Sequence, residues 1–259
     1  MKFFSSHLIL WIWLIFFIPS CVFAIHKPTY TIVDTGQKSY FNNDTYIANP
    51  HKVDEFYGQD TTYLGNQPNY TNNKNGTITD NNTGLMWQKS FTSKLGWFEA
   101  VDYANDSKIG GYIDWRIPTI KELYSLINFQ GNTGTFKYSV TDVPSDAKPY
   151  IDTQYFDFEY SHEERYLDVS SWTQTDFTSS TMYRTQSFFA VNFADGKIKG
   201  HPKYALPERD NAKFSLRLVR GNKKYGQNDF IDQRNGTIYD NATSLLWMKY
   251  DSGDRRVKP

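Results

Sequence analysis

Four basic residues in the C-terminal part of the chain recur at every second position: Lys197, Lys199, His201 and Lys203. Side chains two positions apart project from the same face of an extended segment, so this spacing predicts a row of positive charge. Such a row suits a linear anionic polymer, above all a sulfated polysaccharide. Arg217 and Arg220 would extend the patch, because a guanidinium group forms paired hydrogen bonds with sulfate or carboxylate. The alternative is an edge strand whose lysines only keep it from pairing with another chain.

An acidic segment precedes the basic row, and oxygen-rich loops of this kind can hold Ca²⁺. Its carboxylates are those of Asp152, Asp157, Glu159, Glu163, Glu164 and Asp168. They lack the spacing of a known calcium loop. Two carboxylates held within about 10 Å would also be able to hydrolyse a glycoside, but any chain this acidic offers such pairs. We therefore interpret the segment as a solvated loop around buried Tyr155, Phe156 and Phe158.

Motifs for other kinds of chemistry are missing from the sequence. The five histidines are scattered without zinc spacing, and His162 lacks a second histidine at the required offset. The sequence contains no Gly-x-Ser-x-Gly motif, phosphate-binding loop or dinucleotide fingerprint. We expect a protein that is not an enzyme and that binds neither a metal ion nor a cofactor.

Strands are expected on both sides of the chain's centre. The turn signal Asn75-Gly76, followed by a second turn at residues 82–84, predicts a hairpin with strands at 77–79 and 85–87. The later segments alternate between apolar and polar residues, which is typical of half-buried antiparallel strands. These expected strands lie at 170–175, 187–193, 197–200 and 214–220.

Two helices are expected between these groups of strands. An apolar stripe from Trp97 to Ala104 predicts the first, and a capping box formed by Thr119 and Glu122 opens the second. Residues 131–168 have no regular pattern and predict a long loop. A strand hairpin, two helices, a long loop and an antiparallel strand meander form an α+β order, not a βαβ alternation.

An internal repeat sets the expected domain boundaries. Residues 75–89 read NGTITDNNTGLMWQK, and 160 positions later residues 235–249 read NGTIYDNATSLLWMK. The predicted organisation has four parts: a signal peptide at 1–24, a loop-rich extension at 25–70, a domain at 71–222 and the start of a second copy at 223–259. The second copy is incomplete, and a lone opening segment cannot bury a hydrophobic face of its own.

The N-terminus predicts export. Lys2 precedes an apolar run at residues 8–18, and the small-residue pattern at 22–24 favours cleavage before Ile25. An apolar core of about eleven residues is well short of the roughly 20 that span a membrane, so no span remains after cleavage. Cleavage also removes Cys21, the only cysteine. We expect a periplasmic, cell-surface or extracellular protein, for which nucleic acid is a poor partner.

Two motif groups resemble the bacterial exported family of the Lcl C-terminal domain, long known as a domain of unknown function. The first group combines residues 75–80 with 83–88, and the second combines residues 114–119 with Glu122-Leu123. The resemblance covers residues 30–253 and implies a C-type-lectin-like fold, with glycan binding as an expected activity. Family members tend to carry cysteines at three positions that have none here: Ser39, Asn49 and Leu218.

These observations leave two roles open. The favoured role is an exported non-catalytic module that binds carbohydrate or sulfated polysaccharide in adhesion. The alternative is a structural or assembly domain of an envelope protein that does not bind glycans. Formation of a homo-oligomer is compatible with either role.

Overall fold

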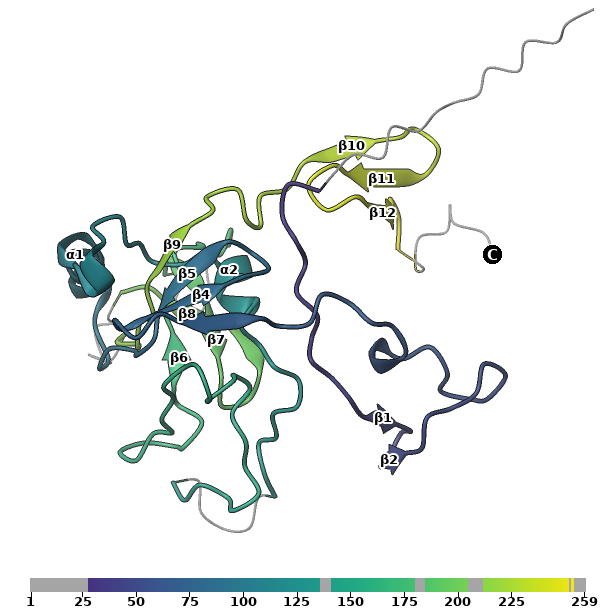
Figure 1. The fold of residues 1–259 in the computed structure, drawn as a ribbon, viewed down its shortest axis with the longest axis horizontal. Coiled ribbons are helices and arrows are strands. Elements are labelled where there is room, and N and C mark those ends of the chain that lie inside the picture. The colour runs from purple at the N-terminus through teal and green to yellow at the C-terminus, as the bar shows by residue number, and fades with distance from the viewer. Residues whose placement is uncertain (1–27, 136–140, 180–184, 205–211, 252, 254–259) are drawn as a thin grey trace, which may run out of the picture.

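A computed structural model describes residues 28–135, 141–179, 185–204, 212–251 and 253. The expected signal peptide at residues 1–24 lies outside the described residues. Two α-helices and several small antiparallel sheets make up the described part, which confirms the predicted α+β class (Figure 1). No helix in the described ranges is long and apolar enough to cross a membrane.

The first sheet joins the two ends of the central domain. Its strand order is β3 (Tyr70–Asn72), β4 (Thr77–Asp80), β5 (Leu85–Gln88) and β9 (Val219–Gly221), with every neighbouring pair antiparallel. The predicted hairpin is therefore confirmed as β4 and β5. Gly76, at the turn between β3 and β4, has a φ of 85°, a conformation that glycine adopts without strain. Because β9 returns to the outer edge of β5, this sheet closes the domain.

The second sheet contains β6 (Ser170–Ser171), β7 (Ser187–Asn192) and β8 (Lys197–Pro202). The expected strand at 214–220 is shorter than predicted, because its pairing partner changes along the segment. Phe214 bridges to Leu95, Ser215 bridges to Ser171, and only residues from Val219 onward join β5 as a strand. The segment 170–175 is likewise a strand only over its first two residues.

Two short helices flank the sheets. The first, α1 (Trp97–Asp106), begins after Gly96, whose backbone N–H donates to Glu99 at 2.8 Å. The second, α2 (Ile120–Tyr124), begins with the predicted capping box. The Thr119 hydroxyl accepts from the Glu122 backbone N–H at 3.2 Å, and the Glu122 carboxylate accepts from the Thr119 backbone N–H at 2.8 Å. Two 3₁₀ turns, η1 (Asp60–Thr62) and η2 (Ile109–Gly111), complete the helical elements.

Loss of this cap should be measurable. We expect Thr119→Ala to lower the free energy of unfolding by roughly 0.5–2 kcal/mol, the usual range for an N-cap residue. Chemical denaturation of the purified chain measures the effect as a shift in the unfolding midpoint. An unchanged midpoint would mean that the cap does not contribute to stability.

The hydrophobic core has two clusters separated by β7. Ile78, Trp87 and Val191 belong to the cluster beside α2, whereas Trp172 and Phe188 belong to the cluster beside α1. All five side chains are fully buried. Because β7 lies between the two clusters, nearly all its residues are buried. One face of the strand packs against each cluster.

The N-terminal segment before β3 consists mostly of loops and contacts the rest of the chain at several points. Its regular structure is limited to β1 (Tyr40–Phe41) and β2 (Tyr46–Ile47). The Tyr30 ring lies 4.9 Å from the Tyr225 ring, and the Phe129 backbone N–H donates to Thr35 at 2.9 Å.

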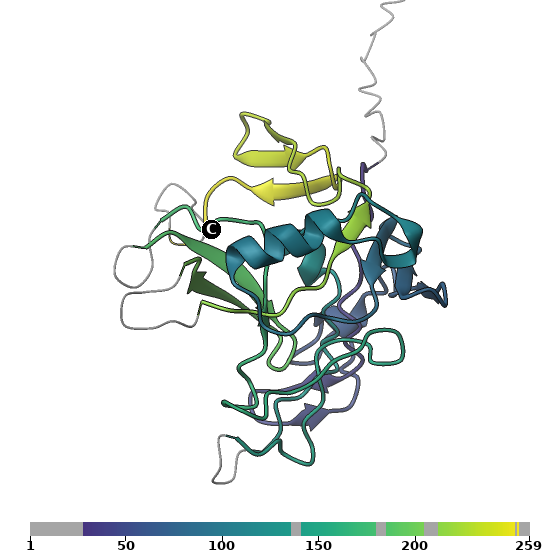
Figure 2. The same cartoon turned by 90° about the vertical axis from the view of Figure 1, so that its left-hand side faces the viewer.

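A third sheet repeats the strands of the first. It consists of β10 (Phe230–Asp232), β11 (Thr237–Asp240) and β12 (Leu245–Met248), all antiparallel. Each strand begins and ends 160 positions after its counterpart in β3, β4 and β5. Figures 1 and 2 show this sheet beside the central domain and outside its core.

Candidate ligand-binding site

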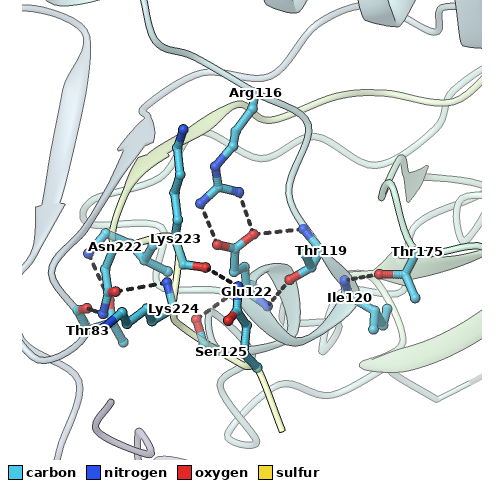
Figure 3. Close-up of polar contacts among 12 residues, drawn as sticks. Thr83, Arg116, Thr119, Ile120, Glu122, Ser125, Thr175, Asn222, Lys223 and Lys224 are labelled. Carbon is cyan, nitrogen blue, oxygen red and sulfur yellow. Dashed lines mark hydrogen bonds and ion pairs between the residues drawn. The ribbon is translucent and has the colours of Figure 1, made fainter. Parts of the chain in front are cut away.

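A hollow of about 450 Å³ opens beside the start of α2. It is built from three parts of the chain: the start of α2 with the segment before it, the segment after β6 and the segment after β9. Its polar lining includes Arg116, Lys121, Glu122, Gln174, Lys223 and Gln227. Figure 3 shows Arg116 and Lys223 approaching the start of α2 from different segments.

Glu122 holds Arg116 in place at this hollow. The Glu122 side chain is 2% exposed, and its two carboxylate oxygens accept hydrogen bonds from Arg116 Nη1 and Nη2 at 2.7 and 2.6 Å. The same carboxylate caps α2 through the Thr119 backbone N–H. The Arg116 side chain remains 21% exposed, and the bonds to Glu122 use two of its five N–H groups. Arg116 is thus both oriented and able to bind a further acceptor.

The segment after β9 brings Lys223 to the lining of the hollow. The Asn222 side chain donates to the Thr83 carbonyl at 3.2 Å and accepts from the Lys224 backbone N–H at 3.1 Å, as Figure 3 shows. Lys223 itself is exposed. These bonds fix the backbone on both sides of Lys223 while its side chain stays available.

Lys121 and Tyr225 also line the hollow, the first with a cationic group and the second with an aromatic ring. The Lys121 ammonium group donates to the Asn228 side chain, which carries no charge to offset it. Burial of Tyr225 raises the pKa of its hydroxyl to about 12, so the ring is a neutral wall. The lining therefore carries three cationic side chains and a single carboxylate, which is already paired with Arg116.

Residues 76–220 match the family described as the Lcl C-terminal domain, which is more than half of the chain. The chain belongs to the Lcl C-terminal domain family. The match includes Arg116, Thr119 and Glu122, whereas Lys223 and Tyr225 lie just beyond it. Comparisons with curated proteins and with solved structures found no match.

The basic row of this Lcl C-terminal domain does not form a continuous charged surface. Lys197 is exposed at the start of β8, but the Lys199 ammonium group forms an ion pair with Asp195 at 2.6 Å. His201 packs against Phe188 and Phe214, and its Nε2 lies 3.2 Å from the Ser170 hydroxyl. Burial lowers the pKa of His201, and the charge of Lys199 lowers it further, so the imidazole is neutral at pH 7.

Lys203 departs most clearly from the predicted row. It follows Pro202, where β8 ends, and it is buried. Its ammonium group donates to Asp176 at 2.8 Å and lies 3.8 Å above the Trp97 ring. Regular alternation ends with the strand, so the two-residue spacing no longer determines where this side chain points.

The two arginines proposed to extend the row also have intramolecular roles. Arg217 is buried in the core and donates to backbone carbonyls. Arg220 donates to Asp114 at 2.6 Å and lies 3.8 Å from the Tyr112 ring. The hydrogen bond from Arg220 lowers the pKa of Asp114. Of the six predicted residues, Lys197 alone is exposed, and no partner of its ammonium group is found among the described residues.

The acidic segment lines a separate hollow of about 320 Å³ with Phe158, Glu159, His162 and Glu163. Within the described ranges, no three histidine, cysteine or carboxylate side chains converge as they would around a metal ion. His162 faces Glu159 at 3.7 Å, and Glu164 pairs with a lysine on the facing segment. The structure thus arranges these carboxylates around aromatic side chains.

Sequence reasoning missed Arg116 and Lys223 as site residues. Residues 116–122 were interpreted as a helix start and as part of the family motif, not as a binding site, although an arginine beside a capping box is an available signal. Lys223 had no comparable signal, because its position depends on β9 returning to β5. Only the folded chain brings the two cations to one hollow.

Proposed function

We propose that this chain is an exported, non-catalytic binding module of C-type-lectin-like fold that binds anionic carbohydrate. The hollow beside α2 is the site that supports this proposal best. Its cations come from the segment before α2, from α2 itself and from the segment after β9, and the only carboxylate in its lining is engaged by Arg116. A sulfate or carboxylate group on a polysaccharide supplies the negative charge that this lining lacks.

The fixed position of Arg116 favours binding over a loose electrostatic attraction. Its guanidinium group is held by two hydrogen bonds to Glu122, so little side-chain freedom is lost when a ligand binds. Arginine recognises planar oxyanions through paired hydrogen bonds, whereas lysine contributes a point charge. The hollow combines both types of group, which suits a sugar that carries an acidic substituent.

Neutralising the lysines of the hollow should weaken binding to heparin, used as a probe of sulfated polysaccharide. We expect Lys121→Gln and Lys223→Gln each to weaken binding about fivefold, because an exposed charge contributes about 1 kcal/mol. Titration calorimetry at low and at physiological salt measures the loss. The slope of affinity against salt should also decrease.

Two matched variants test whether the hollow itself is responsible. Lys224→Gln removes the same charge one residue away from Lys223, and Lys197→Gln removes the exposed cation of β8. We expect both to bind heparin within about twofold of the parent chain, since surface changes outside a site have small effects. Equal losses in all four variants would indicate nonspecific charge attraction, and no loss in the hollow variants would place binding elsewhere.

One observation favours the alternative role as an assembly domain. The third sheet exposes large apolar side chains, among them Leu246 and Trp247. An assembly domain would form oligomers through such a surface and would show no affinity for heparin in the experiment above.

A further inference from the structure

The third sheet exposes residues whose counterparts form the core of the first domain. Trp247 is 54% exposed, whereas Trp87, at the same place in the first sheet, is fully buried. Other exposed apolar side chains on the third sheet are those of Phe230, Ile231, Leu245, Leu246 and Met248. Contiguous apolar surface of this kind on a folded protein marks an interaction site.

The first sheet shows what the outer edge of such a strand binds. There β9 pairs antiparallel with β5, and the Gln88 backbone N–H donates to the Leu218 carbonyl at 3.0 Å. The backbone N–H and C=O groups of successive residues point to opposite sides of a strand, so the backbone groups of Met86, two residues before Gln88, also face β9. On β12, Leu246 corresponds to Met86 and Met248 corresponds to Gln88. No described strand pairs with the outer edge of β12.

The chemistry of β12 limits what can occupy this edge. Of the edge strands in the described ranges, β12 alone has four consecutive apolar residues without a charge, a proline or a glycine. The edge of β8 carries lysines and that of β10 carries Asp232, residues that protect an edge from pairing. A second β12 strand therefore matches this edge without placing a charge against apolar side chains.

The turn between β11 and β12 is held by the N-terminal extension, whereas the outer edge of β12 pairs with no described strand. The Thr29 backbone N–H donates to the Ala242 carbonyl at 2.9 Å, and Ala242, in the turn before β12, is buried. Leu246 remains 62% exposed. The attachment thus orders the sheet while its apolar edge faces outward.

We propose that β12 pairs antiparallel with β12 of a second copy of this chain and joins two third sheets into one. A two-fold axis perpendicular to the sheet at Leu246 places this residue opposite the partner's Leu246. The same axis places Leu245 opposite the partner's Trp247. Such an interface is self-complementary, because both copies contribute the same strand. It adds backbone hydrogen bonds and covers the exposed leucine and tryptophan side chains.

Cysteine cross-linking tests this register directly. In a hydrogen-bonded antiparallel pair the Cα atoms are about 5.5 Å apart, which lies within the range for a disulfide. In a Cys21→Ser background, Leu246→Cys should form a covalent dimer under mild oxidation. Ile231→Cys places an exposed cysteine on β10, away from the proposed axis, and should remain monomeric under denaturing electrophoresis. Equal cross-linking of the two variants would overturn the proposed pairing.

Sedimentation velocity of the full chain tests the association itself. We expect the parent chain to dimerise in a concentration-dependent way and Leu246→Lys to raise the dimer dissociation constant at least about tenfold, because it places like charges at the axis. Ile113→Lys changes another exposed apolar residue and should leave the dimer intact. A monomeric parent, or a Leu246→Lys variant that dimerises as the parent does, would refute the proposal.

Discussion

Replacing Arg217 with methionine should lower the free energy of unfolding by about 3–5 kcal/mol, because methionine removes the buried donor that links several backbone carbonyl groups. The guanidinium group donates to the carbonyls of Gln88 at 2.8 Å, Ser90 at 3.1 Å and Asp157 at 2.6 Å, and also to that of Lys89. Burial lowers the pKa of Arg217 to about 9, so the group is still charged at pH 7. Urea denaturation followed by tryptophan fluorescence measures the loss.

Arg220→Met is the matched control for this experiment. Arg220 lies three positions further along the chain and forms an ion pair with Asp114, whose side chain is half exposed. Exposed ion pairs contribute little, so we expect a loss of at most about 1 kcal/mol. Similar losses for the two variants would show that the carbonyl contacts of Arg217 do not stabilise the core.

Glu122→Gln should be the second strongly destabilising change, with a loss of about 2–4 kcal/mol. The substitution leaves the Arg116 guanidinium group without its anionic partner and weakens the cap of α2. Thermal and urea denaturation measure the loss. A double-mutant cycle with Arg116→Gln isolates the coupling between the two side chains.

Glu99→Gln provides the comparison for Glu122, because Glu99 has the same capping position in α1. Its carboxylate accepts from the Gly96 backbone N–H, but the residue is exposed. We expect a loss of only a few tenths of a kcal/mol for this exposed cap. If Glu122→Gln were as mild as Glu99→Gln, the ion pair with Arg116 would not contribute to stability.

The elements that the sequence predicted correctly depend on local interactions. The strands β4 and β5 follow from two turn signals, Asn75-Gly76 before β4 and residues 82–84 between the two strands, and the start of α2 follows from Thr119 and Glu122. In each case the residues that determine the element lie within a few positions of one another, so their spacing is sufficient.

The positions of the site residues depend on contacts between distant segments, and the spacing of residues in the sequence does not reveal such contacts. Lys203 is buried because Asp176 and Trp97, from distant segments, provide an acceptor and an aromatic face. Arg217 occupies a polar position in an alternating pattern, which predicts exposure, yet backbone carbonyls surround it. An alternating pattern predicts on which face of a strand a side chain lies. It does not predict which other segments of the chain cover that face.

The short connection from β9 to β10 contains Lys223 and Tyr225, so it ties the hollow to the third sheet. Residues 223–229 span at most about 25 Å even when fully extended. In a dimer joined at β12, both hollows would therefore remain within reach of one long polysaccharide. Once one hollow has bound the polysaccharide, the second hollow would meet the same polymer at an effective concentration in the millimolar range. Avidity would increase with the length of the polymer. Short oligosaccharides would occupy the hollows one at a time, with only the affinity of a single site.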